Sequence, residues 1–293
     1  MAINYKIIII TIVVIIGLSV FYLQYDKSNI DNGKIFEHSE KFFNFKIETE
    51  NMNLIELPID SIFKISGLRD GYTIDNDDII FSKFFFELDD ENLLQYDELI
   101  NTDEKTVVIF PLFTAAAYNE PGFYNYFAGD CNETCLTVPL VAFLRTEIGG
   151  NGANILQLLN YNFLSDIDID KNPEILNDFD KVILLHNEYV TKKQFDAITS
   201  HPNVIYLYPN ALYAEIEINY EQKTITLIRG HNFPEKQINN GFDWKFDNTH
   251  PYEYDRECND WQFYEIDNGV MLNCFPEEQL YKDPSLLKTL KEL

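Results

Sequence analysis

Basic residues are scarce in this sequence. The 293 residues include 22 lysines and arginines against 48 aspartates and glutamates, a formal net charge of −26. A surface with this excess of negative charge repels the phosphates of nucleic acids and anionic lipid headgroups. We therefore expect no nucleic-acid partner. The charge favours solubility, and cationic ligands or metal ions also fit it.

Several motifs with a known chemistry are missing. Gly149, Gly150 and Gly152 form a glycine-rich stretch, but no Lys-Ser/Thr pair follows it and no G-x-G-x-x-G is present. We expect a tight turn and no bound nucleotide. The G-x-S-x-G motif of serine hydrolases is absent. Residues 166–170 (DIDID) begin like a calcium loop, but Lys171 stands where glycine is required. Because isoleucine alternates with aspartate, we expect an exposed strand there.

Cysteine occurs only four times. An even number of cysteines in a domain outside the cytoplasm suggests disulfide bonds. Four cysteines allow three pairings, and sequence proximity favours Cys131 with Cys135 and Cys258 with Cys274. The loop-entropy model gives a stabilisation of about 2 kcal/mol for the first pair and about 3 kcal/mol for the second. Zinc is the alternative, but the spacing lacks the C-x2-C pairs of zinc ribbons.

Charged residues are absent from residues 7–23, which read IIIITIVVIIGLSVFYL. A helix of this length just spans a bilayer core of about 30 Å. Lys6 precedes the run, and bulky residues follow it where a signal peptidase requires small ones. We therefore expect a retained single-pass anchor in the cell membrane, with residues 1–6 in the cytoplasm. A polar linker at residues 24–34 would lead to an extracytoplasmic domain at residues 35–293.

The clearest alternation of strands and helices lies in the core of this domain, residues 104–230. Strand, helix and strand at the observed spacing form the βαβ signature of a parallel sheet. A half-exposed antiparallel hairpin should follow it. We expect strands at 106–113, 136–144, 180–186 and 203–208, helices at 153–160 and 191–200, a hairpin at 212–219 and 223–229, and an irregular tail with a helix at 285–293. Residues 35–100 predict only short strands or helices.

One helix start is well defined. Thr191 and Gln194 form a capping box, with Val190 and Phe195 at the positions of a hydrophobic staple. Residues 186–189 (HNEY) are therefore the turn that joins a buried strand to this helix. In open α/β sheets, ligands bind at the carboxyl ends of the parallel strands, where this turn should lie.

Two groups of side chains near this sheet edge have chemical potential. His186 and Glu188 can bind metal or exchange protons, or Glu188 can accept hydrogen bonds from the start of the next helix. Tyr118 and Tyr124 follow the first strong strand, so a parallel sheet would place them beside Glu188. Phenolates suit ferric iron, and aromatic packing is the alternative role. Arg145 can hold a substrate carboxylate or pair with a surface acid.

The stretch at residues 186–227 contains a His-x-Glu-Tyr turn, a helix, a strand that ends in an asparagine turn with an aromatic pair, and a hairpin. This pattern resembles the C-terminal domain of the large subunit of N,N-dimethylformamidase. The matching residues are His186, Glu188, Tyr189, Asn210 and Tyr213. The resemblance implies a flavodoxin-like α/β fold of the class I glutamine amidotransferase type.

In that amidase, two tyrosines and a glutamate hold a mononuclear iron. The resemblance implies that Glu188 binds iron or another metal, with Tyr118 and Tyr124 as the tyrosine ligands and Tyr126 as the other candidate. It also implies that His186, Glu188 and Asn210 act in catalysis. Substrate binding would fall to Tyr189, Tyr213 and Arg145. The family's tryptophan after Glu-Tyr is Val190 here, and the cysteine nucleophile of glutamine amidotransferases is absent.

Two functions therefore remain open. The first is a metal-dependent hydrolase of a small amide, and the second is a non-catalytic surface module that binds a protein partner or has a structural role. The departures from the family pattern favour the second. An intact carboxylate–tyrosine cluster around one point would favour the first, whereas separated or buried, packed side chains would favour the second.

Overall fold

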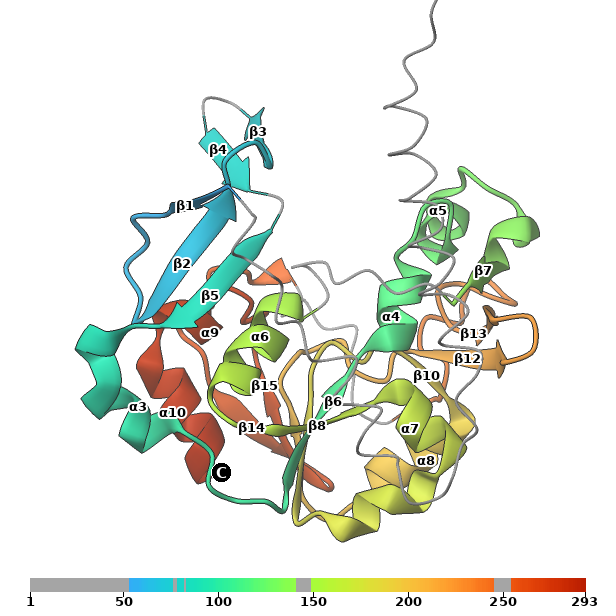
Figure 1. Cartoon of the computed structure of the whole chain (residues 1–293). Coiled ribbons are helices and arrows are strands. Elements are labelled where there is room, and N and C mark those ends of the chain that lie inside the picture. The colour runs from blue at the N-terminus through green and yellow to red at the C-terminus, as the bar shows by residue number, and fades with distance from the viewer. Residues whose placement is uncertain (1–52, 76–77, 82, 141–148, 245–253) are drawn as a thin grey trace, which may run out of the picture. The chain divides into compact units, whose positions relative to one another are not determined.

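A central sheet of six strands occupies the middle of the computed structural model, in the order β14-β15-β11-β9-β6-β8 (Figure 1). All neighbouring pairs are parallel except β14 with β15. The protein is thus of the mixed α/β class, as expected. The strands of this sheet are β6 (Thr106–Phe110), β8 (Asn162–Ser165), β9 (Lys181–Leu184), β11 (Val204–Tyr206), β14 (Phe263–Ile266) and β15 (Gly269–Leu272).

The structure describes residues 53–75, 78–81, 83–140, 149–244 and 254–293. All of them belong to the Asn44–Leu293 unit of the chain. No helix in these ranges is long and apolar enough to cross a membrane. The expected anchor at residues 7–23 and the candidate Arg145 lie outside the described residues.

The order of the parallel strands reverses between β6 and β9. Counted along the chain, the five parallel strands lie in the order 2-1-3-4-5. Connections that leave β6 in one direction and β9 in the other diverge at this point, and open α/β sheets bind their ligands at the carboxyl ends of the strands at such a reversal. The turn that contains Glu188 follows β9, and the segment that contains Tyr118 follows β6.

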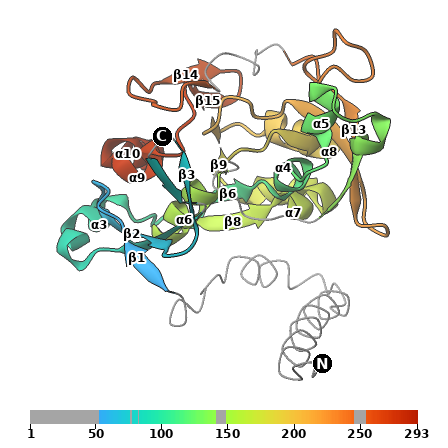
Figure 2. The same cartoon turned by 90° about the horizontal axis from the view of Figure 1, so that it is seen from above.

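Helices cover both faces of the central sheet. α7 packs against α8, whereas α6 packs against α9 and α9 against α10. Both views show these two groups on opposite sides of the sheet (Figures 1 and 2), as right-handed crossovers in opposite directions require. Their bounds are α6 (Gly150–Leu158), α7 (Asp166–Lys171), α8 (Lys192–Ser200), α9 (Gln279–Lys282) and α10 (Pro284–Glu292), with a 3-10 helix η5 (Pro173–Asp178) after α7.

A second sheet lies beside α4 (Leu112–Ala117) and has the order β10-β12-β13-β7. Its face packs on α4 and α5 (Phe123–Ala128) in an apolar cluster that contains Phe113, Phe123 and Tyr189. The strands are β7 (Thr137–Pro139), β10 (Tyr189–Thr191), β12 (Ala214–Asn219) and β13 (Thr224–Arg229), and the 3-10 helix η3 (Glu133–Leu136) precedes β7. The expected hairpin is confirmed as β12 and β13, and β7, which contains Pro139, is an edge strand as predicted.

The segment before the central sheet forms two small antiparallel sheets, β1-β2-β5 and β3-β4. The first packs on the C-terminal helices through Phe84 and Phe86, whose rings contact Tyr281. The elements are β1 (Leu54–Glu56), β2 (Phe63–Leu68), β3 (Tyr72–Asp75), β4 (Asp78–Phe81), β5 (Phe84–Leu88), η2 (Asp90–Asn92) and α3 (Leu93–Leu99).

Three expectations about secondary structure are wrong. Residues 166–170 are not an exposed strand, because Ser165 and Asp168 form a capping box that starts α7, and Asp166 and Asp170 are buried. The first strand ends at Phe110, because Pro111 starts α4 and its ring cannot continue a sheet ladder. The tail after residue 230 is also more regular than expected, since it contributes β14 and β15 to the central sheet.

Both expected disulfides are present, and the three-way choice of pairing is resolved. Cys131 pairs with Cys135 after α5, and Cys258 pairs with Cys274 just after β15. The described chain has no free cysteine that could bind zinc. The capping box of Thr191 and Gln194 is also confirmed at the start of α8.

Candidate functional site

The turn between β9 and β10 presents Glu188, whose side chain is only 2% exposed. Thr114 of α4 accepts hydrogen bonds at its Oγ1 from the amides of Glu188 and Tyr189, over 3.0 and 3.2 Å. The Glu188 carbonyl accepts hydrogen bonds from the amides of Tyr213 and Ala214, over 2.8 and 3.1 Å. The backbone at Glu188 is therefore fixed both by α4 and by the start of β12.

The structure brings Glu188 together with two of the three candidate tyrosines. Tyr118, at the end of α4, donates a hydrogen bond from its phenol to Oε2 of Glu188 over 2.8 Å. The phenol oxygens of Tyr118 and Tyr124 are 3.0 Å apart. Tyr126 is separate, because its ring packs against Phe233. We call Tyr118, Tyr124 and Glu188 the oxygen cluster.

Burial keeps the phenol of Tyr118 protonated. It raises the pKa of Tyr118 well above the usual value for a phenol, and the neighbouring charge of Glu188 raises it further. Tyr118 therefore keeps its proton at neutral pH when no cation is present, and its hydroxyl donates a hydrogen bond to the carboxylate. The alternative role for Glu188, hydrogen bonding to amides at the start of α8, is not what the carboxylate does here.

Two histidines contact the Glu188 carboxylate from different sides. His186 Nε2 lies 3.6 Å from Oε2, and His231 Nε2 lies 3.2 Å from Oε1. The ring of His186 stacks on Tyr208 and meets Phe275 edge to face. The two carboxylate oxygens therefore have different neighbours: Oε2 faces the phenol and His186, and Oε1 faces His231.

His231 was not identified from the sequence. It follows the hairpin of β12 and β13, with a left-handed backbone at φ 51°, and its Nε2 lies 3.0 Å from the phenol of Tyr189. The rings of Tyr124 and Tyr213 pack against it. No spacing in the sequence points to this contact, because 43 residues separate His231 from Glu188.

The donor atoms of the cluster suit a hard cation. The basic side chains that pair with Glu188 within the described residues are the two histidines, and a buried carboxylate needs compensation by a cation or by hydrogen-bond donors. Three oxygens, one from a carboxylate and two from phenols, form a ligand set appropriate to ferric iron. Among the described residues, no three His, Cys, Asp or Glu side chains form a group that could hold a metal. A metal would therefore depend on Tyr118 and Tyr124.

The remaining candidates have varied positions. Tyr189 is fully buried in the apolar cluster beside α4 and α5, and its phenol lies 3.0 Å from Nε2 of His231. Tyr213 contacts the His231 ring. Asn210 follows β11 and is buried, and its Oδ1 accepts no hydrogen bond from the described residues.

A second buried carboxylate, Glu277, contacts Tyr208, whose ring stacks on His186. The phenol of Tyr208 donates a hydrogen bond to its Oε2, and the amide of Asn151 donates to its Oε1 over 3.0 Å. The turn at Gly149, which the sequence predicted, is confirmed by a left-handed φ of 78°. The start of α6 thus does bind an anion, and that anion is a carboxylate of the same chain.

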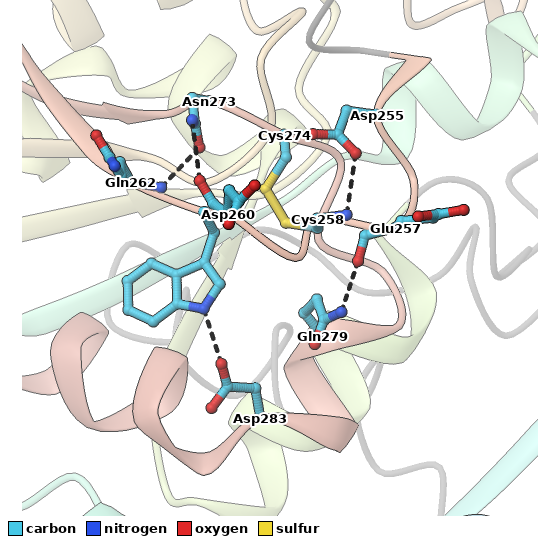
Figure 3. Close-up of a disulfide and its surroundings, with 10 residues drawn as sticks. Asp255, Glu257, Cys258, Asp260, Gln262, Asn273, Cys274, Gln279 and Asp283 are labelled. Carbon is cyan, nitrogen blue, oxygen red and sulfur yellow. Dashed lines mark hydrogen bonds between the residues drawn. A yellow bond between two sulfur atoms is a disulfide. The ribbon is translucent and has the colours of Figure 1, made fainter.

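Figure 3 shows the Cys258–Cys274 disulfide. It restrains the segment that continues through Phe275 to Glu277. Around it, Asp255 accepts a hydrogen bond from the Cys258 amide over 3.0 Å, and Gln279 of α9 donates to the Glu257 carbonyl over 2.6 Å (Figure 3). The disulfide lies one residue before Phe275, so it restrains the cover of His186 directly.

The sequence matches no known protein family and no curated protein at a significant level. The resemblance to N,N-dimethylformamidase, with its expected iron and amide substrate, therefore stays a prediction.

Proposed function

We propose that this protein is a metal-dependent hydrolase of small amides. The observation that supports this function is the row of hydrogen-bonded oxygens that runs from Glu188 through Tyr118 to Tyr124. These are the residue types, and two of the three tyrosine candidates, that the resemblance implied for iron. The intact cluster favours the hydrolase over the non-catalytic binding or structural module.

The topology supports the finer fold assignment that accompanies this proposal. A parallel order of 2-1-3-4-5 is that of flavodoxin-like sheets, whose ligands bind at the switch between strands 1 and 3. In this chain those strands are β6 and β9, and the oxygen cluster lies just beyond their carboxyl ends.

In this proposal, Tyr118, Tyr124 and Glu188 would hold iron or another hard cation through their oxygens. When bound, such a cation supplies a Lewis acid that polarises an amide carbonyl. His186 Nε2, beside Oε2 of Glu188, is placed to accept a proton from an attacking water. His231 keeps Oε1 of Glu188 hydrogen-bonded, so that Oε2 stays directed at the phenols.

We also propose that this domain lies outside the cytoplasm, with residues 7–23 as its membrane anchor. The two disulfides support this location, because disulfides persist mainly in oxidising compartments. Protease added to intact cells should then digest the domain. Complete protection of the domain until the membrane is opened would contradict this topology.

The deciding measurement is the metal content of the full-length chain in detergent, after incubation with ferric or ferrous iron or zinc. We expect close to one bound ion in the wild type, its loss in Glu188→Gln, and its retention in Glu217→Gln, which changes an exposed carboxylate on β12. A panel of small amides then tests hydrolysis by the loaded protein. A folded wild type that binds none of these metals would contradict the hydrolase and leave the binding or structural module.

A further inference from the structure

Asp166 is a fully buried carboxylate that contacts the Glu188 turn through Asn187. It is the first residue of α7, directly after β8. Its Oδ2 accepts a hydrogen bond from the amide of Phe113 over 2.9 Å. Its Oδ1 accepts hydrogen bonds from the side-chain amides of Asn187, over 2.8 Å, and Gln194, over 3.1 Å. The three donors come from α4, from the Glu188 turn and from α8.

These partners connect Asp166 to both parts of the oxygen cluster. Phe113 lies in α4, the short helix that ends at Tyr118. Asn187 is the residue between His186 and Glu188. One carboxylate therefore ties the helix that presents the phenol to the turn that presents the metal-binding glutamate.

We propose that Asp166 is a positioning residue that fixes the Glu188 turn relative to α4, and with it the geometry of the oxygen cluster. The statement that a metal ligand is being positioned rests on the proposed function. The mechanical link through Phe113 and Asn187 does not depend on it. Groups that support metal ligands commonly change metal affinity by about 10- to 100-fold when removed.

The protonation of Asp166 matters for this role. Burial raises the pKa of Asp166 to about 7, although its three hydrogen-bond donors act in the opposite direction. The groups that face the carboxyl are the Phe113 amide of α4, Asn187 of the turn, Gln194 of α8 and, on its own helix, Asp168. Only Asp168 among these four titrates. The ionised form accepts all three bonds, whereas a protonated oxygen must donate and so conflicts with one of the donors.

Asp166→Asn tests the role against a matched control. Asp170→Asn changes a second buried carboxylate on the same helix, whose partners are Thr191 and Tyr220 and which has no hydrogen bond to the Glu188 turn. Both variants are made in the full-length chain. The first readout is hydrogen exchange of the Glu188 and Tyr189 amides in the metal-free protein, and the second is iron affinity as a function of pH.

We expect Asp166→Asn to speed exchange of these two amides by about tenfold or more, since they are protected by local hydrogen bonds. Iron affinity should fall by about 10- to 100-fold, and the pH dependence near 7 should weaken. Asp170→Asn should change neither property. If Asp166→Asn does not fold, Asn187→Ala, which removes only one of the three bonds, should reproduce the faster exchange.

Equal exchange at Glu188 and Tyr189 in the Asp166 and Asp170 variants would overturn the proposal. The two readouts, amide exchange and iron affinity, also distinguish the positioning role of Asp166 from the proposed hydrolase. If the wild type binds no metal but Asp166→Asn still loosens the turn, the proposed hydrolase fails while the positioning role stands. If the Glu188 and Tyr189 amides of Asp166→Asn exchange as slowly as in the wild type and the variant binds metal normally, the positioning role fails while the proposed hydrolase stands.

Discussion

The phenol of Tyr118 and the carboxylate of Glu188 form a 2.8 Å hydrogen bond, although 70 residues separate them in the chain. Their contact arises because β6 and β9 are neighbours in the sheet, so that the segments after the two strands leave from the same edge. The second phenol, from Tyr124, lies 3.0 Å from the first. Each member of this row can be changed separately.

Tyr118→Phe should abolish stoichiometric iron binding, because it removes the phenol that contacts Glu188. Tyr124→Phe should weaken binding by the same mechanism. Tyr126→Phe is the control, since this ring packs on Phe233 outside the cluster. Iron bound to phenolates absorbs visible light, so absorbance and metal analysis check the result together. Retention of the visible band in Tyr118→Phe would contradict the assignment of ligands.

His231→Leu should lower iron affinity by about 10- to 100-fold, because Oε1 of Glu188 loses its hydrogen-bond donor. His231→Gln keeps a donor and should recover part of the affinity. His201→Leu is the control, because His201 is matched in burial but lies elsewhere: its Nε2 is 3.0 Å from the Phe179 carbonyl, and its Nδ1 is 3.2 Å from the Asn203 amide. His201→Leu should reduce the stability of the protein without changing its iron affinity. Isothermal titration with iron distinguishes these results, and equal losses at the two positions would show a general effect of unfolding.

The stability of the protein should depend on pH through Asp166. Its pKa is about 7 in the folded chain and about 3.9 in an unfolded chain. Because the folded form binds the proton more tightly, its contribution to stability is full below about pH 4 and is lost as pH rises to about 7. The loss is on the order of 4 kcal/mol. Denaturant titrations of wild type and Asp166→Asn between pH 4 and 8 measure it. A wild-type slope that the variant fully retains would show that other groups cause it.

Loss of the disulfides should have unequal effects. Replacement of Cys258 and Cys274 by serine should cost about 3 kcal/mol of unfolding free energy, and replacement of Cys131 and Cys135 about 2 kcal/mol, since the closed loops differ in length. The first change should also weaken metal binding, because it frees Phe275 beside His186. Tryptophan fluorescence during denaturation gives the free energies. The reverse order would show that strain or residual structure outweighs loop length.

The part of the fold that local signals determine could be predicted from the sequence. β9 and β11 are short apolar runs bounded by polar turns, and Thr191 starts α8 through a capping box that needs only four residues. Ser165 and Asp168 form a similar capping box at the start of α7. The alternation of aspartate and isoleucine at residues 166–170 instead suggests a strand, so this helix is missed from the sequence. The Asp267-Asn268-Gly269 turn between β14 and β15 is also a hairpin signal in the sequence.

The sequence predicts the part of the site that follows neighbouring strands of the central sheet. Two strong strands in a parallel sheet were enough to place Tyr118 and Tyr124 near Glu188. His231 and Glu277 could not be found this way. They reach the site through the turn after a hairpin and through the segment after β15, and such long-range contacts leave no periodic pattern in the sequence.

β15 has a consequence for synthesis of the chain. Until residues 269–272 have been made, β11 has no partner on that side and exposes the backbone of Val204, Ile205 and Tyr206 as an open edge. An apolar open edge is a template for pairing with other chains. A ribosome that stalls or terminates shortly before β15 would therefore release a protein that is prone to aggregate, although Tyr118, Tyr124 and Glu188 of the oxygen cluster have already been made.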